Sequence, residues 1–222
     1  MTERSIQIAI DGPAGAGKST VAKQLSERLG ILYLDTGAMY RAFAFFCLKN
    51  GLGTSPADEQ ILDAFEHFDL VFEGKTILLN GEDITSVIRT PEIDRAVSPI
   101  SANPLIREKM VEKQKAVASG RDIVMEGRDI CDVVMPDAPY KFYLDASVEE
   151  RARRRWQQNT DKGIESSLED IKQDIVRRDE YDSTREATPL AVSRDAVLVD
   201  TTGMSLEEVI GLIISKVGEG SI

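Results

Sequence analysis

A glycine-rich segment directly follows the first apolar run of the sequence. The run covers residues 6–10, and the segment reads Gly12-Pro13-Ala14-Gly15-Ala16-Gly17-Lys18-Ser19. Two glycines separated by four residues and followed by Lys and Ser are typical of a phosphate-binding loop. Small residues let backbone N–H groups close around phosphate oxygens, and the helix that follows directs its positive end at the anion. The segment therefore predicts a nucleoside triphosphate site; a plain glycine-rich turn is the alternative.

The surroundings of this segment favour the phosphate-binding interpretation. A buried-type strand precedes it, and an amphipathic helix with Val21 and Leu25 on one face follows and stops at Gly30. In such a loop Lys18 reaches the β- and γ-phosphates, and the Ser19 hydroxyl coordinates Mg²⁺.

Composition narrows the classes of partner. The 222 residues carry a net charge of −11, which argues against nonspecific binding to nucleic acid or to an anionic membrane. The two cysteines, Cys47 and Cys131, have neither pairing nor metal-ligand spacing, as is usual in a reducing compartment. No apolar run approaches the roughly 18 residues of a membrane span. We therefore expect a cytoplasmic protein without a membrane partner, and a monomer by default.

The order of apolar runs predicts an α/β fold. Runs near residues 31–34, 123–125, 141–144 and 196–199 each follow a helical segment, which predicts a parallel sheet of five strands with the first run included. Residues 69–85 depart from this pattern, because Glu73-Gly74 and Asn80-Gly81 are hairpin turn signals. The sequence predicts one domain over residues 1–222, with an inserted antiparallel subdomain at about 38–92.

Charged residues stand where strands of such a sheet end. Glu126-Gly127-Arg128-Asp129 follows the run at 123–125, and Arg41 lies one turn into the helix after the second strand. Ligands bind at the carboxyl ends of strands in open α/β sheets, so both places are site candidates. A solvated turn and a solvated helix residue are the alternatives. His67, the single histidine, has no partner in sequence and is expected at the surface near a helix end.

An arginine-rich block follows the fourth parallel strand. Ser147 and Glu150 form a capping box that opens a helix. The helix carries Arg151, Arg153, Arg154 and Arg155. These side chains either pair with neighbouring glutamates on the surface or form a lid, at about 151–166, over the transferring phosphate.

Other phosphate-binding classes fit less well. No guanine-reading Asn-Lys-x-Asp motif is present, nor an Asp-x-x-Gly after the third strand, and motor or transporter ATPases are longer. A small-molecule kinase with an inserted acceptor-binding subdomain remains.

The motifs together resemble those of bacterial cytidylate kinases (CMP/dCMP kinases), over essentially the whole chain. In order they are Gly12 to Ser19, Leu34-Asp35-Thr36-Gly37-Ala38-Met39-Tyr40-Arg41, Glu126 to Asp129, Pro136-Asp137-Ala138-Pro139, Glu149 to Arg154, and Arg178 to Pro189. The resemblance implies a P-loop nucleoside monophosphate kinase fold, a parallel five-stranded sheet flanked by helices with an inserted NMP-binding subdomain and an arginine-rich lid. It also implies Mg²⁺-assisted transfer of the γ-phosphoryl group of ATP to CMP or dCMP.

The resemblance assigns roles residue by residue. Implied ATP contacts are Gly12, Pro13, Ala14, Gly15, Ala16, Gly17, Lys18, Ser19, Thr20, Arg151 and Arg155, with Ser19 the metal ligand. Implied CMP contacts are Thr36, Arg41, Ser98, Arg107, Arg128, Asp129, Arg178, Asp182 and Arg185. Implied catalytic residues are Lys18, Arg41, Arg128, Arg154 and Arg185.

Two departures and two other functions stay open. Glu126 stands where relatives often have Asp, and it either contacts the Mg²⁺ shell through water or orders the loop. Cys131-Asp132 replaces the Gly-Thr common in relatives, so that loop is expected to differ in shape. A kinase for another nucleoside monophosphate and a noncatalytic nucleotide-binding regulator are the alternative functions.

Overall fold

The computed structural model describes residues 5–161 and 163–219. The first part contains β1 (Gln7–Asp11), α1 (Lys18–Leu29), β2 (Leu32–Asp35), α2 (Thr36–Lys49) and α3 (Asp58–Glu66). Then follow β3 (Leu70–Glu73), β4 (Thr76–Leu79), β5 (Glu82–Asp83), η1 (Val87–Arg89), α4 (Pro91–Ala102) and α5 (Pro104–Ala118). The last part contains β6 (Ile123–Glu126), η2 (Ile130–Val134), β7 (Tyr140–Asp145), α6 (Val148–Asp161), α7 (Leu168–Thr184), β8 (Val197–Asp200) and α8 (Leu206–Glu219).

The chain divides into two compact units. The phosphate-loop unit comprises the residues up to Leu34 together with those from Val117 onward, and the insertion unit comprises Asp35–Ala116. The subdomain that the sequence predicts at about 38–92 lies inside the insertion unit, which also takes in α4 and most of α5.

The large sheet has the strand order β2-β6-β1-β7-β8, which confirms the predicted five-stranded parallel sheet. The central strand β1 pairs in parallel with β6, Ile8 opposite Val124, and with β7, Ile8 opposite Tyr140. Ile8 and Ile10 are fully buried, as expected for a parallel strand that is covered on both faces.

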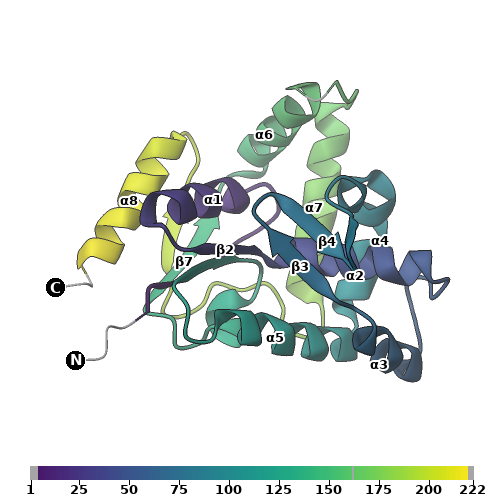
Figure 1. The fold of residues 1–222 in the computed structure, drawn as a ribbon. Helices are drawn as coiled ribbons and strands as arrows, with labels where there is room; N and C mark the ends of the chain where they lie inside the picture. Colours follow the sequence, from purple (N-terminus) through teal and green to yellow (C-terminus); the bar gives the residue numbers. More distant parts are fainter. Residues whose placement is uncertain (1–4, 162, 220–222) are drawn as a thin grey trace. The chain divides into compact units, whose positions relative to one another are not determined.

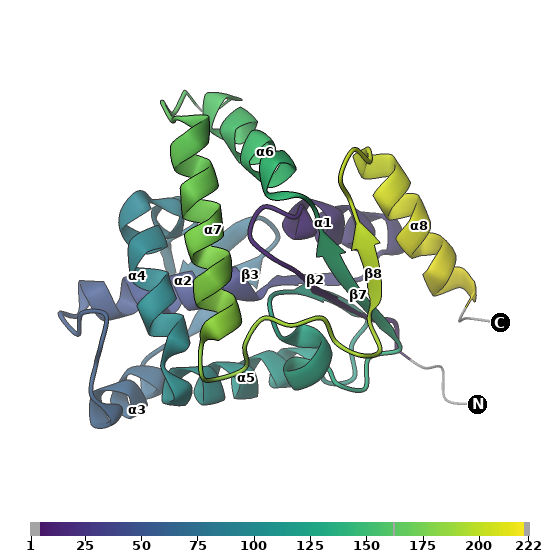
Figure 2. The same cartoon turned by 180° about the vertical axis from the view of Figure 1, so that it is seen from behind.

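Helices α1 and α8 lie side by side against this sheet (Figures 1 and 2). Leu25 of α1 and Ile210 and Ile213 of α8 join the same apolar core as Ile10 and Phe142 of the sheet. Gly30 ends α1 in the left-handed conformation, where the sequence predicted the stop. This core fixes the position of the loop that connects β1 to α1.

The first residue of that loop approaches β7 closely. Gly12 has φ of +146°, and a Cβ added to it would lie 2.0 Å from the carbonyl oxygen of Leu144. No side chain fits at this position without moving backbone, so glycine is required both for conformation and for space.

The insertion unit holds a separate antiparallel sheet, β3-β4-β5, which confirms the predicted meander. Its two turns use residues with positive φ, Gly74 at 60° and Asn80-Gly81 at 50° and 80°. Its core includes a cluster of aromatic rings, in which Phe43 stacks on Phe65 at 4.4 Å and meets Phe68 edge-on at 5.2 Å.

The structure corrects one local expectation and shows two features that the sequence did not predict. The capping box of α6 is half formed: the Glu150 amide donates to Ser147 Oγ, but the Ser147 amide donates to Thr202 Oγ1, because the Glu150 carboxylate binds arginines instead. Asp182 lies within α7, two residues before the helix ends at Thr184. The π-helical turn η2 carried no sequence signal that predicted it. The box of Ser205 and Glu208 at the start of α8 is complete.

Replacement of Gly12 tests the close approach to β7. We expect Gly12→Ala to lower the free energy of unfolding by about 2 kcal/mol, because its methyl group meets backbone and its φ is strained. Gly211→Ala in α8 is the matched control. That site is open, so the same change is expected to raise the free energy by about 0.5 kcal/mol through the unfolded chain. Chemical denaturation measures both, and a Gly12→Ala protein as stable as the parent would contradict the packing.

Candidate active site

The phosphate loop is the backbone segment that connects β1 to α1. Gly15 and Gly17 have φ of 80° and 91°, and a Cβ on Gly17 would meet only Arg154 Nη1, at 3.7 Å. Lys18 Nζ donates to the Pro13 carbonyl at 2.7 Å across the loop. Burial, helped by the nearby Arg128 and opposed by Glu126, lowers the pKa of Lys18 to about 7. This ammonium group is a cation placed to receive an anion.

Ser19 and Glu126 bring oxygen atoms together beside the loop. Ser19 Oγ donates to Glu126 Oε1 at 2.5 Å, and Tyr33 OH donates to the same oxygen at 3.3 Å. Glu126 is buried at the end of β6. Hydroxyl and carboxylate oxygens are ligands that suit Mg²⁺, which takes few protein ligands and completes its shell with water and substrate phosphates. Among the described residues, no group of three or more His, Cys, Asp or Glu side chains is placed to hold a metal ion.

Four of the predicted CMP contacts form one charged cluster around Asp182. Arg128 Nε donates to Asp182 Oδ2 at 2.9 Å, linking the segment after β6 to α7. Burial raises the pKa of Asp182, but Arg128, Arg178 and Arg185 together hold it below its usual value. Arg185 Nε in turn donates to the Thr188 carbonyl at 2.8 Å. Three guanidinium groups thus act on one carboxylate, and the carboxylates of Glu126 and Asp179 also act on Arg128.

Sequence reasoning missed Asp11, which shapes the turn after Asp129. Its buried carboxylate accepts from the amides of Ile130 at 2.9 Å and Cys131 at 2.8 Å, and burial raises its pKa. The Asp129 carbonyl accepts from Val133 in the same turn. An acidic residue between a buried strand and a glycine loop was the available signal, because such a carboxylate must find donors.

Arg151 is buried against the phosphate loop. Its Nε donates to the Ala146 carbonyl at 2.9 Å, and its Nη1 donates to the Ala14 carbonyl at 3.0 Å and to Asp179 Oδ2 at 2.5 Å. The sequence assigned Arg151 to ATP, and the guanidinium group does lie at the loop. Asp179 is a partner that sequence reasoning did not single out.

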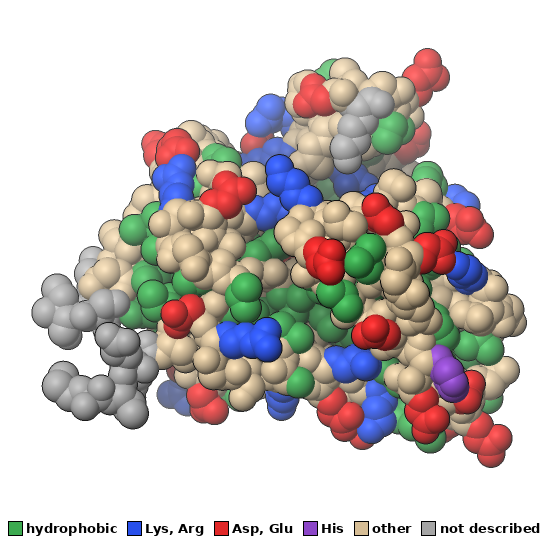
Figure 3. All heavy atoms as spheres, in the orientation of Figure 1, with side chains coloured by type: hydrophobic (Ala, Val, Ile, Leu, Met, Phe, Trp, Pro, Cys, Tyr) green, Lys and Arg blue, Asp and Glu red, His purple; other side chains and the backbone are tan. Residues whose placement is uncertain are grey.

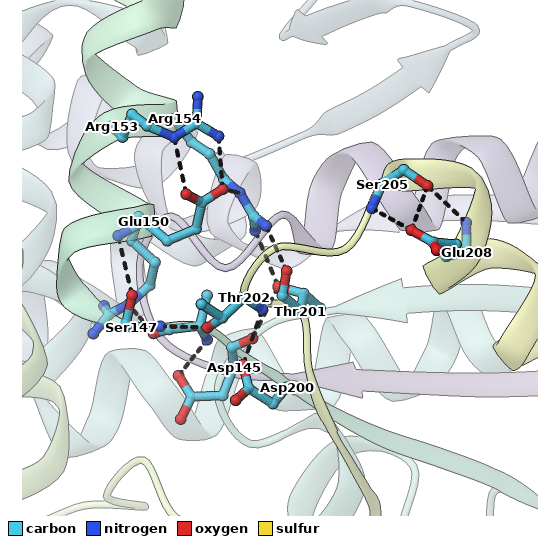
Figure 4. A network of polar contacts seen from close by, with 12 residues as sticks. Asp145, Ser147, Glu150, Arg153, Arg154, Asp200, Thr201, Thr202, Ser205 and Glu208 are labelled. Carbon is cyan, nitrogen blue, oxygen red and sulfur yellow. Dashed lines mark hydrogen bonds and ion pairs between the residues drawn. The ribbon is translucent and has the colours of Figure 1, made fainter.

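Arg154 links α6 to the loop after β8 (Figure 4). Its Nε donates to Glu150 Oε1 at 2.9 Å, while Nη1 and Nη2 donate to the hydroxyl and the carbonyl of Thr201 at 3.0 and 2.7 Å. Arg153 also donates to Glu150, and its side chain is exposed. Of the two interpretations of the arginine block, Arg153 therefore fits surface pairing with a glutamate. Arg155 is exposed. The predicted lid at about 151–166 includes Lys162, which lies outside the described residues, and it stays a prediction.

Asp129 lies in the phosphate-loop unit, and the insertion unit contains the remaining four predicted CMP contacts. Arg41 of α2 donates through Nε and Nη2 to Asp94 Oδ1 of α4, at 3.2 and 2.8 Å. Arg107 of α5 is buried, donates to the Ser101 carbonyl at 3.0 Å and lies 5.5 Å from the ring centroid of Tyr40.

Two further predicted positions and one missed residue belong to the same unit. Thr36 is the buried first residue of α2, and Ser98 lies partly exposed on α4. Asp35 caps α2 by accepting from the Ala38 amide at 2.8 Å and pairs with Arg89 at 2.9 Å. His67 ends α3 with 67% of its side chain exposed, as predicted, and is the purple side chain of Figure 3.

Comparison with known proteins decides the family. Residues 8–219 match the family described as cytidylate kinase. The chain belongs to this family. It is 48% identical over 222 residues to the cytidylate kinase of Geobacillus kaustophilus (strain HTA426), with 98% of each chain covered. It is 46% identical over 210 residues to the cytidylate kinase of Caldanaerobacter subterraneus subsp. tengcongensis, covering 95% of this chain and 93% of the relative.

Solved structures support the fold at low sequence identity. An uncharacterized protein from Eubacterium ventriosum ATCC 27560 gives a TM-score of 0.56 at 13% identity and covers 97% of this chain and 99% of its own. Shikimate kinase from Acinetobacter baumannii gives 0.50 at 15% identity, covering 98% and 95%. Among the described residues, no helix has the length and apolar character needed to cross a bilayer.

Glu150 gives the site a pH-dependent element. The hydrogen bond from Arg153, helped by Arg154, lowers the pKa of Glu150 from 4.5 to about 2. A lowered carboxylate pKa stabilises the folded state above pH 4.5, and this contribution is lost as the pH falls toward 2. We expect Glu150→Gln to reduce the free energy of unfolding by about 1 kcal/mol at pH 7, after allowance for solvent screening of Arg153.

Urea denaturation at pH 7 and pH 3 measures this effect. The difference between Glu150→Gln and the parent should shrink at pH 3. Glu149→Gln is the control, because Glu149 is 69% exposed and its pairing with Lys172 is expected to contribute little. An equal difference at both pH values would contradict the role of the Glu150 charge.

Proposed function

We propose that this chain transfers the γ-phosphoryl group of ATP to CMP or dCMP, giving ADP and CDP or dCDP. The observation that carries the proposal is the charged cluster of Arg128, Arg178, Asp182 and Arg185, which shares one unit with the phosphate loop. A noncatalytic regulator would need the loop but not a cluster of guanidinium groups for an acceptor phosphate. Family membership favours the kinase over that alternative.

On the donor side, the loop amides and Lys18 hold the triphosphate. Lys18 Nζ exchanges the Pro13 carbonyl for the β- and γ-phosphates, whose negative charge keeps the buried ammonium group protonated. The donor set is completed by the other predicted contacts Gly12, Pro13, Ala14, Gly15, Ala16, Gly17, Thr20, Arg151 and Arg155.

Mg²⁺ is the metal that the oxygen donors beside the loop fit best. Ser19 would hold it through its hydroxyl, and Glu126 would orient that hydroxyl through the 2.5 Å hydrogen bond. When bound, the metal neutralises the charge that develops on the phosphate oxygens. The short contact favours the loop-ordering role of Glu126 over contact with the Mg²⁺ shell through water.

On the acceptor side, the proposal keeps the roles that the family resemblance assigns. Arg128 and Arg185 of the phosphate-loop unit and Arg41 of the insertion unit bind the phosphate of CMP. Arg178 and Asp182 bind the ribose. The base is read by Ser98, Arg107 and Asp129, with Thr36 as a further contact.

The reaction is then an in-line displacement. An oxygen of the CMP phosphate forms a bond to the γ-phosphorus while the bond from that phosphorus to the β–γ bridging oxygen breaks, and ADP leaves. The attacking oxygen is already anionic, so no strong general base is needed. The cationic groups Lys18, Arg128 and Arg154 offset the repulsion between the two polyanions. Exclusion of water from the site favours phosphoryl transfer to CMP over hydrolysis of ATP.

The preference for cytosine over uracil depends on Asp129. A carboxylate accepts from the exocyclic amino group of cytosine, whereas uracil presents an oxygen at that position and leaves the carboxylate facing another acceptor. The proposal includes action in the cytoplasm as a monomer, without a nucleic-acid partner, supported by the net charge of −11.

A coupled ADP-release assay with ATP and Mg²⁺ tests both function and specificity. We expect strong turnover of CMP and dCMP and poor turnover of UMP, AMP and GMP. Asp129→Ala should reduce the CMP over UMP preference about tenfold or more, because the discriminating acceptor is removed.

The control is Asp137→Ala, a loss of one exposed carboxylate, which should keep the preference. Equal turnover of CMP and UMP by the parent would refute the role of Asp129. No turnover with any acceptor would favour the regulator.

A further inference from the structure

The peptide groups of Ala14, in the middle of the phosphate loop, are held on both sides by one ion pair. The Ala14 amide lies 3.4 Å from Asp179 Oδ1, to which it donates. The Ala14 carbonyl accepts from Arg151 Nη1 at 3.0 Å, and this same nitrogen binds Asp179 Oδ2 at 2.5 Å. Arg151 and Asp179 therefore act together as a clamp on one loop residue; we call them the Ala14 clamp.

The clamp is shielded from solvent. The side chain of Arg151 is 6% exposed and that of Asp179 is 21% exposed. A Cβ on the next loop residue, Gly15, would lie 3.1 Å from Arg151 Cβ, so the start of α6 is packed against the loop. Charged hydrogen bonds in such a setting are stronger than at an open surface, because solvent screens them less.

Asp179 belongs to the helix that also supports the acceptor cluster. It precedes Asp182 by three residues on α7, and Asp182 holds Arg128. The two carboxylates thus tie one helix to the phosphate loop and to the residue after β6. Within the described residues, no other carboxylate from a helix accepts a hydrogen bond from a backbone amide of the loop residues 12–17.

We infer that Asp179 is a positioning residue for the ATP phosphates. It touches no substrate in this account; it holds the Ala14 peptide and the Arg151 guanidinium in the arrangement that receives the triphosphate. A loop that is held in its binding conformation loses less conformational entropy on binding, and so binds more tightly. The inference rests on the proposed function only in that the phosphate loop binds ATP.

The sign of the effect separates this role from simple repulsion. A carboxylate near a binding site for a polyanion would weaken binding through its charge alone, and removing it would tighten ATP binding. If Asp179 positions the loop, removing it weakens ATP binding instead. Opposite outcomes are therefore expected from the two roles.

Calorimetric titration with Mg·ATP, without CMP, is the experiment. We expect Asp179→Ala, which removes both contacts, to weaken ATP binding about tenfold or more. Asp179→Asn keeps an acceptor for the Ala14 amide but no charge for Arg151, so it should weaken binding less. Glu180→Ala, a neighbouring exposed carboxylate on the same helix, is the matched control and should bind ATP as the parent does.

Titration with Mg·tripolyphosphate, which lacks adenine and ribose, locates the loss. If the clamp positions the loop, Asp179→Ala weakens the binding of tripolyphosphate and of ATP by similar factors. The affinity for CMP should then change less than threefold. Unchanged or tighter ATP binding would overturn the inference. So would an equal loss of affinity for ATP and CMP with a lower melting temperature, because that pattern indicates a general structural role.

Asp179→Glu is the variant to measure if Asp179→Ala and Asp179→Asn fold poorly. It retains the charge and should recover part of the ATP affinity; a variant that folds and binds ATP no better than Asp179→Ala would count against the clamp. None of these titrations needs turnover. A parent protein that binds ATP but phosphorylates no acceptor would therefore refute the proposed function and leave this test intact.

Discussion

Pairing of arginines with carboxylates is the interaction on which the site depends. Four arginines that are predicted to act on phosphate groups each hold a carboxylate in the described chain. The pairs are Arg128 with Asp182, Arg151 with Asp179, Arg154 with Glu150, and Arg41 with Asp94. Without Asp182, for example, the positive charge of Arg128 would act unopposed by its partner on the buried Lys18, whose pKa Arg128 lowers. The carboxylates therefore make it possible to assemble the binding groups before the substrates arrive.

Such pairs serve function more than stability. Taking two charges out of water costs much of what their attraction returns, so a buried pair is weak evidence for a gain in folding free energy. Their value here is geometric. The phosphate loop itself is fixed by contacts of another kind, the close approach of Gly12 to Leu144 and the packing of α1 in the core. The pairs then orient side chains around a backbone that is already set.

The arginine–carboxylate pairs also show which interactions a bound phosphate group must replace. A phosphate group competes with a carboxylate for the same guanidinium, and it does so with more charge and with oxygens of similar geometry. Lys18 illustrates the same exchange with a neutral partner, because its ammonium group rests on the Pro13 carbonyl. We therefore expect Lys18, Arg128 and Arg41 to exchange partners when the nucleotides bind, whereas the Arg151–Asp179 pair stays in place and holds the phosphate loop.

Much of this arrangement could be predicted from the sequence. The loop Gly12 to Ser19, the order of strands and helices, and the hairpin turns at Gly74 and Asn80-Gly81 follow from local residue patterns, and the structure confirms them. The assigned arginines could be named because their motifs are local too.

The partners of these arginines could not be predicted. Asp179 lies 165 residues from Ala14, and Asp11 lies 119 residues from the Ile130 amide that it accepts from. A single sequence does not reveal which of many acidic side chains meets a given loop. The π-helical turn η2 was missed for a related reason, since its first two amides donate to the distant Asp11 carboxylate.

A crystal structure with CMP bound tests the central claim most directly. We expect the CMP phosphate to lie within hydrogen-bond distance of the Arg128 guanidinium group, with Asp182 turned to the ribose hydroxyls. We also expect Arg41 to exchange Asp94 for a phosphate oxygen. A CMP phosphate that contacts neither arginine, with both carboxylate pairs unchanged, would contradict the central claim.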